Sequence, residues 1–143
     1  MKNIIQILFF FFTVSQIHFS QWIQTNGPYG GYVNCFTISG TNLFAGTNNG
    51  IFLSTNEGNS WIKINNNSID DYILALASKD TYLFACSGWS GVFRSTDNGT
   101  SWIEVLGPSN NTSFQAFAIN DTNLFVGAAS GNGGGVFILP IMV

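Results

Sequence analysis

The sequence predicts an all-β protein built from about three copies of a four-stranded antiparallel unit. First, the motif Leu-Phe-(Ala/Val)-(Gly/Cys) begins at Leu43, Leu83 and Leu124, at steps of 40 and 41 residues. Second, the apolar runs are short, rich in aromatic and β-branched residues, and separated by Gly, Asn, Ser and Asp, as expected of strands. Third, no stretch after residue 20 keeps the 3.6-residue period of a helix.

Each copy contains apolar runs at corresponding positions, and the second copy has four, at residues 73–77, 82–86, 91–95 and 102–106. The third and fourth runs carry recurring motifs, Gly-(Ile/Val)-Phe and Trp-Ile, which start at Gly50, Gly91 and Gly135 and at Trp22, Trp61 and Trp102. Four antiparallel strands at such a step are typical of β-propeller blades, which pack face to face and are covered on both sides. An ordinary β-sandwich would not need the same residues at a fixed step.

The copies divide residues 21–143 into an incomplete β-propeller, with blades at about residues 32–65, 72–106 and 113–139. Residues 22–25 precede any innermost strand, so we expect them to be an outer strand that closes the last blade of a ring. The third blade stops after its third strand, because Ile138–Val143 replaces the turn that should follow. Propellers need about four to eight blades. We therefore expect a truncated or frameshifted N-terminal fragment; the alternative is a natural three-blade piece that assembles with other copies.

Three blades would leave two blade faces open. We expect apolar residues such as Phe36, Leu43 and Phe52 to line these faces. Repeat architectures bury their core between adjacent units, and large exposed apolar patches drive association. The chain is therefore not expected to be a stable monomer.

Two octapeptides, residues 54–61 and 95–102, join the third run to the fourth with the pattern Ser-Thr-(Asn/Asp)-x-Gly-x-Ser-Trp. In a tight turn the Asn or Asp side chain accepts hydrogen bonds from backbone N–H groups, and Gly takes a positive φ without a clash. The Trp ring anchors the turn between blades. We assign this structural role to Ser54, Asn56, Gly58, Trp61, Ser95, Asp97, Gly99 and Trp102.

The octapeptides resemble Asp boxes, the BNR repeats of bacterial neuraminidases. The whole unit, including GVFRSTDNGTSW at residues 91–102, is more similar to propellers related to the photosystem II stability/assembly factor, and similar units occur in sortilin-type propellers and xyloglucanases. The resemblance covers residue 21 to about residue 137. It implies a sialidase-like propeller with a full ring of seven blades, in which Asp boxes are structural turns away from the catalytic face. The first copy departs by carrying Asn56, which keeps an acceptor but no charge.

The sequence offers little for catalysis. A sialidase needs an arginine cluster, a tyrosine nucleophile and an acid/base carboxylate, but Arg94 is the one arginine here. The single histidine, His18, lies in the N-terminal segment, and no cysteine pair has zinc-ligand spacing. Neighbouring Asp70 and Asp71 would point to opposite faces on entering a strand. We interpret them as a solvated loop, and we expect no catalytic residue, cofactor or metal.

The N-terminal residues indicate where in or outside the cell the protein is located, and the composition indicates which partners it can bind. Residues 1–20 combine Lys2, an apolar run over residues 4–14 and small or polar residues up to Ser20, the layout of a cleaved secretory signal peptide. The alternatives are a buried strand or a membrane anchor, but the run is short for a membrane span. The formal charge is −3 with only four Lys and Arg, so nucleic acid is not an expected partner.

Export implies an oxidising compartment. Cys35 and Cys86 fall at different points of the repeat. We expect two small buried thiols and treat a disulfide as the alternative.

Binding is expected at the loops between strands 2 and 3 and between blades, because these loops differ among the copies and lie opposite the octapeptides. Tyr29, Asp71 and Trp89 are the candidate ligand contacts; ordinary packing or solvent exposure is the alternative for each. The leading function is a non-catalytic exported scaffold that binds a protein, with a glycan as second ligand class. The rival is the N-terminal part of a glycan-active hydrolase whose catalytic residues lie in missing blades.

Overall fold

The computed structural model describes residues 21–64, 69, 72–107, 112–130 and 134–141. The predicted signal peptide (residues 1–20) and Asp71 lie outside the described residues. Within them the chain forms eleven β-strands, and no helix there could cross a membrane. The strands are β1 (Val33–Ser39), β2 (Asn42–Thr47), β3 (Gly50–Ser54), β4 (Ile62–Lys63), β5 (Ile73–Lys79), β6 (Tyr82–Ser87), β7 (Gly91–Ser95), β8 (Ile103–Leu106), β9 (Thr112–Ile119), β10 (Asn123–Ser130) and β11 (Gly135–Pro140).

The strands form three antiparallel sheets in chain order, which confirms the all-β prediction of three repeated sheets. The first two sheets have the strand orders β1-β2-β3-β4 and β5-β6-β7-β8, and the third has β9-β10-β11. We call them blades 1, 2 and 3. Corresponding residues pair alike in blades 1 and 2, as in Phe36↔Ala45 and Leu76↔Ala85. Within the described residues the third sheet has three strands.

The outer strands differ from the prediction. Strand β4 has two residues and β8 has four, and Trp61 and Trp102 immediately precede these strands instead of lying within them. Residues 22–25 were predicted to be an outer closing strand, but here they belong to no sheet. A strand needs a hydrogen-bonded neighbour, and no described strand runs beside this segment.

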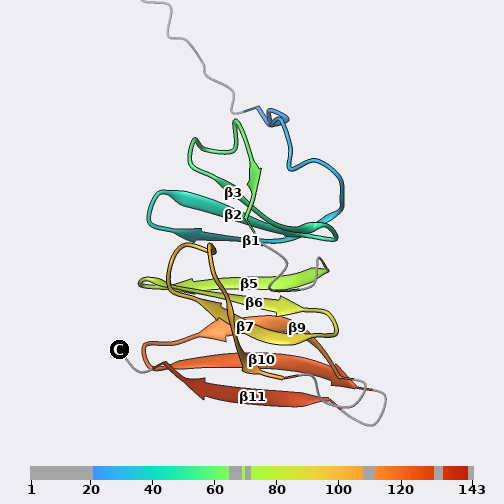
Figure 1. Ribbon diagram of the computed structural model, residues 1–143, viewed down its shortest axis with the longest axis vertical. Coiled ribbons are helices and arrows are strands. Elements are labelled where there is room, and N and C mark those ends of the chain that lie inside the picture. The colour runs from blue at the N-terminus through green and yellow to red at the C-terminus, as the bar shows by residue number, and fades with distance from the viewer. Residues whose placement is uncertain (1–20, 65–68, 70–71, 108–111, 131–133, 142–143) are drawn as a thin grey trace, which may run out of the picture.

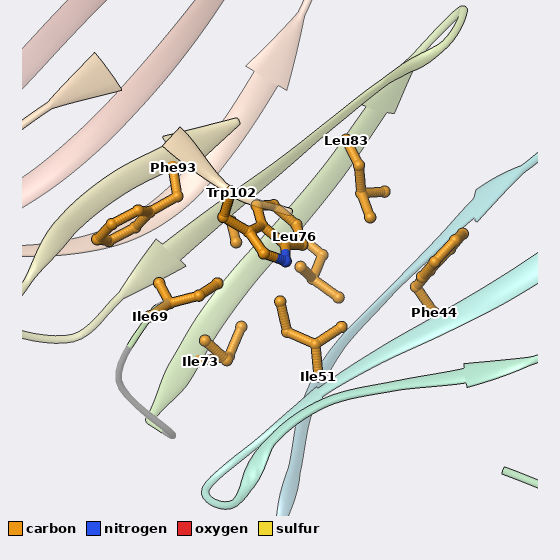
Figure 2. Close-up of a cluster of buried hydrophobic side chains, with 9 residues drawn as sticks. Phe44, Ile51, Ile69, Ile73, Leu76, Leu83, Phe93 and Trp102 are labelled. Carbon is orange, nitrogen blue, oxygen red and sulfur yellow. The ribbon is translucent and has the colours of Figure 1, made fainter. Parts of the chain in front are cut away.

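The three sheets stack face on face, with β1, β5 and β9 against one another (Figure 1). One apolar core lies between blades 1 and 2 and includes Phe44, Ile73 and Trp102 (Figure 2). A second core lies between blades 2 and 3 and includes Phe84 and Phe114. Only blade 2 is therefore covered on both faces.

Strand register shows which residues share a face of each blade. We call the face toward the preceding blade the leading face and the face toward the following blade the trailing face. The leading face of blade 2 carries Leu76, Ala85 and Phe93, which are cross-strand partners and pack in the first core. Its trailing face carries Phe84 and Cys86, which pack in the second core. By the repeat, Phe44 lies on the trailing face of blade 1. Each interface in the chain therefore joins the trailing face of one blade to the leading face of the next.

Polar bonds fix the alignment of neighbouring inner strands. Asn34 Nδ2 donates to the carbonyl of Ile73 at 2.9 Å, and Ser78 Oγ donates to the carbonyl of Ile38 at 2.5 Å. Between blades 2 and 3, Lys79 Nζ lies 3.8 Å from Asp121 Oδ1. Asp121 is fully exposed and the N···O distance is long, so the Lys79–Asp121 pair contributes little to stability. Burial of the apolar faces contributes most of the free energy that holds neighbouring blades together.

The leading face of blade 1 and the trailing face of blade 3 are open, as predicted. Phe36 is 56% exposed on the first, and Ile138 is 61% exposed on the second. The expectation for Phe52 was wrong, because this residue is only 7% exposed. Phe52 lies in the middle of the sheet, paired with Ala45 on one side and Lys63 on the other.

Both cysteines are free thiols; Cys86 is buried in the second core, as the sequence favours, whereas Cys35 is only partly buried against the first core. Burial raises the pKa of the Cys35 thiol to about 11 and raises the pKa of Cys86 as well. The thiolate is the reactive form, so at pH 8 neither thiol should react with Ellman's reagent faster than the protein unfolds. In urea both should react completely. Fast labelling of Cys35 in the folded protein would contradict the closed first core.

Candidate functional site

Because the strands of each blade are antiparallel, its loops lie at the two ends of the strands. The inner strands β1, β5 and β9 start at one edge, which also holds the β2–β3 and β6–β7 turns; we call it the loop edge. The octapeptides follow β3 and β7 and lie at the opposite edge. The topology therefore places the variable loops and the octapeptide turns at opposite ends of each blade.

The second octapeptide is a hydrogen-bonded turn organised by Asp97. Its Oδ1 accepts from the N–H of Ser101 at 2.8 Å and from Ser95 Oγ at 2.7 Å, and its Oδ2 accepts from Ser101 Oγ at 2.6 Å. Ser95 Oγ in turn accepts from the N–H of Gly99 at 2.8 Å. Gly99 has φ 82° and follows Asn98 at φ 55°, a left-handed pair that suits Gly and Asn.

The first octapeptide repeats this geometry with Asn56. Its Oδ1 accepts from the N–H of Ser60 at 2.9 Å, and its Nδ2 donates to Ser60 Oγ at 2.9 Å. The two tryptophans, Trp61 and Trp102, each donate Nε1–H to the turn glycine's carbonyl at 3.0 Å. An uncharged amide therefore supports the same turn as a carboxylate.

Hydrogen bonds from Ser101, followed by the one from Ser95, lower the pKa of Asp97 to about 2, from 3.8 in the unfolded chain. This carboxylate stabilises the fold fully above pH 3.8, and the contribution is lost as pH falls toward 2. We expect a drop in melting temperature between pH 4 and pH 2 in the wild type and a smaller drop in Asp97→Asn. Asp97→Ala should lower the melting temperature by a few degrees already at pH 7.

Thermal unfolding followed by circular dichroism from pH 2 to pH 7 measures these effects. Asn56→Asp is the matched control, since it should add acid sensitivity to the first turn. Identical pH profiles for wild type and Asp97→Asn would rule out the charged cap.

A shallow depression of about 690 Å³ lies at the loop edge. All three blades line it, with Val33 and Asn34 from blade 1, Tyr72, Leu74 and Trp89 from blade 2, and Ser113 and Gln115 from blade 3. Trp89 is 64% exposed and Tyr72 is 41% exposed. The depression thus presents two accessible aromatic rings beside neutral hydroxyl and amide groups.

Local sequence explains how blade 2 presents these rings. A Cβ at Gly88 would lie 2.5 Å from Tyr72 Cδ1, so glycine lets the Tyr72 ring lie against the β6–β7 turn. The Gly88 N–H also donates to the Tyr72 carbonyl at 2.9 Å. This turn is one residue longer than the β2–β3 turn at Asn48 and Asn49, and Trp89 occupies its middle.

The candidate contacts do not come together in one place. Trp89 lines the three-blade depression, whereas Tyr29 lines a separate hollow of about 520 Å³ with residues 24–28 and Val33. Asp71 lies outside the described residues. Sequence reasoning missed Tyr72, Asn34 and Gln115. The position of Tyr72 before an inner strand, matching Tyr32 in blade 1, was an available signal.

The described residues show no arrangement for metal or acid–base chemistry. They contain no group of three or more His, Cys, Asp or Glu side chains that could hold a metal ion. The Arg94 guanidinium lies 5.2 Å from the centroid of the Tyr82 ring, a cation–π contact. Arg94 is not among the residues of the depression.

One solved structure is similar to this chain over most of its length. The crystal structure of the computationally designed Ika4 protein aligns with a TM-score of 0.46 and 11% identity, over 87% of this chain and 100% of that chain. No protein-family model matches the sequence, and no curated protein is significantly similar to it.

Proposed function

We propose that this protein is a non-catalytic, exported scaffold of the Asp-box propeller type that binds a protein partner at the three-blade depression. The composition of the depression carries the proposal. Exposed Trp89 and Tyr72 offer aromatic area, and Asn34, Ser113 and Gln115 offer neutral hydrogen bonds. Aromatic side chains are enriched in protein interfaces. Among the described residues that line the depression there is no carboxylate, histidine, lysine or arginine.

The octapeptide geometry supports the Asp-box part of the proposal. Both turns use the Ser, Asn or Asp, Gly and Trp of the motif in one hydrogen-bonded arrangement. They lie at the edge opposite the depression, which leaves the loop edge for binding. Export follows from the pattern of residues 1–20 and is tested by N-terminal sequencing of secreted protein, which should begin near Gln21. A sequence that still contained residues 4–14 would refute signal cleavage.

A photo-crosslinker tests the partner directly. Benzoylphenylalanine at position 89 in the producing cells should give a covalent adduct with a protein, identified by mass spectrometry. The same group at Thr41, an exposed residue near the octapeptide edge, is the matched control and should give none. Equal adduct patterns at both positions, or no adduct at position 89, would contradict the proposal.

A neutral glycan is the second candidate, favoured by the same aromatic and amide groups. Sugar rings stack on aromatic faces, and amides bond their hydroxyls. Titration with cellohexaose should then change tryptophan fluorescence in the wild type, and Trp89→Ala should abolish the change. If cellohexaose does not change the fluorescence of the wild type, the glycan is contradicted and a protein partner is favoured.

The glycan-active hydrolase gains no support from the described residues. Its catalytic centre would need cationic and carboxylate side chains at the loop edge. Arg94 instead stacks over Tyr82, and its partner strand β6 fixes it within blade 2.

A further inference from the structure

An apolar cavity of about 110 Å³ lies between blades 2 and 3. Val92, Val105 and Leu106 line it from blade 2, and its blade 3 wall includes Val126 and Phe137. Apolar cavities of about 150 Å³ accept a benzene ring, so this smaller cavity would have to widen, by movement of its wall side chains, to admit an indole ring.

The corresponding place between blades 1 and 2 is filled by Trp102. This side chain is 8% exposed and packs in the first core with Phe93 and Ile51 (Figure 2). In the repeat, Phe93 corresponds to Phe137 and Ile51 corresponds to Val92. The described residues of blade 3 include no fourth strand, and in the repeat the cavity corresponds to the place that Trp102 fills between blades 1 and 2.

The chain carries an unused Trp-Ile pair, Trp22-Ile23, outside every sheet. Trp22 is fully exposed and Ile23 is 85% exposed. A Cβ on Gly58 would lie 3.4 Å from Thr25, and a Cβ on Gly99 would lie 2.5 Å from Ile64. Thr25 therefore lies against the first octapeptide. Ile64, which follows the outer strand of blade 1, lies against the second octapeptide in the same way. The N-terminal segment occupies the place of an outer strand from a blade that precedes blade 1.

The two open faces are the two halves of one interface. Blade 3 exposes a trailing face with Val136 and Ile138, and blade 1 exposes a leading face with Phe36 and Ile38. The chain already joins a trailing face to a leading face twice. Blades 1 and 3 of one chain lie at opposite ends of the stack (Figure 1), so Trp22 is not beside its own blade 3.

We propose that a second copy of this chain supplies the missing strand. Trp22–Thr25 of that copy adds to the free edge of β11 and inserts Trp22 into the cavity, while its blade 1 covers the trailing face of blade 3. The register follows from blade 2, where Arg94 pairs with Ile103, so Ile138 pairs with Ile23. Adding a strand to an open edge uses its unpaired backbone groups.

Head-to-tail contacts of this kind either close into a ring or continue as a filament. Two copies of a three-blade chain make a ring of six blades, within the range of four to eight known for propellers. Three copies would make nine, which exceeds it. The occupant is therefore one further copy, and the assembly is a closed dimer in which each chain completes the other.

Light scattering after size-exclusion chromatography tests the assembly, with the full chain secreted so that N-terminal processing is native. The wild type should have the mass of two copies. Trp22→Ala should raise the dissociation constant of the dimer at least tenfold, while Trp89→Ala, which removes another exposed ring away from this interface, should not change it. A monomer, a series of larger species, or equal behaviour of the two variants would overturn the proposal.

A disulfide crosslink tests the register without relying on affinity. Directly opposed residues of antiparallel strands have Cβ atoms about 4.5–5.5 Å apart, close enough for a disulfide after small adjustments. Ile23→Cys with Ile138→Cys should therefore give a covalent dimer on mild oxidation. Ile23→Cys with Ile103→Cys, on the already paired outer strand of blade 2, should give none. An intrachain crosslink in the first variant, or no crosslink at all, would refute the second copy as donor.

Discussion

Phe84→Ala is expected to lower the free energy of unfolding by about 3–5 kcal/mol. Phe84 is 1% exposed on the trailing face of blade 2 and packs in the second core. Its ring centroid lies 6.5 Å from that of Phe117 in blade 3 and 6.3 Å from that of Tyr82. Removing the ring leaves a cavity at the interface that joins two blades, and the flat sheets on either side cannot collapse into it.

Urea unfolding at a fixed protein concentration measures this loss. Trp89→Ala is the control, because it removes a larger ring that is mostly exposed and should change stability by less than about 0.5 kcal/mol. Domains are stable by only about 5–15 kcal/mol in total, so the Phe84 variant should unfold at a much lower urea concentration. Similar midpoints for the two variants would show that the blades do not pack through this interface.

Gly91→Ala is expected to cost at least ~2 kcal/mol, whereas Gly135→Ala should cost little. The two glycines hold the same position in blades 2 and 3. Gly91 has φ 116°, and a Cβ there would collide with the Leu106 carbonyl oxygen of the fourth strand. A Cβ on Gly135 would meet nothing within 4 Å, because the described part of blade 3 has no fourth strand beside β11.

Both substitutions are compared by urea unfolding in the Trp22→Ala background, where a strand from a second copy should not reach Gly135. The difference between the two costs then reports the left-handed φ of Gly91 together with its contact with the fourth strand. Equal costs would mean that the outer edge of blade 3 is covered within a single chain. No change for Gly91→Ala would mean that β8 does not hold Leu106 against β7.

The strands and turns were predictable because their causes are local. The recurrence at Leu43, Leu83 and Leu124 fixes the step of the repeat, and the short apolar runs fix the strands. Each octapeptide closes on itself, since the bonds of Asp97 reach no further than Ser101. An element that needs a distant partner is different: residues 22–25 belong to no sheet within this chain, and their role as an outer closing strand stays a prediction.

The sequence by itself therefore determined the kind of sheet, the number of blades and the chemistry of the turns. Only the tertiary structure decided which residues share a surface. Trp89, Asn34 and Gln115 are tens of residues apart, yet they meet because the inner strands of all three blades start at one edge. The burial of Trp102 and the exposure of Trp22 follow from the same cause. The two share a Trp-Ile motif, and the presence or absence of a packed neighbouring blade alone decides whether the ring is covered.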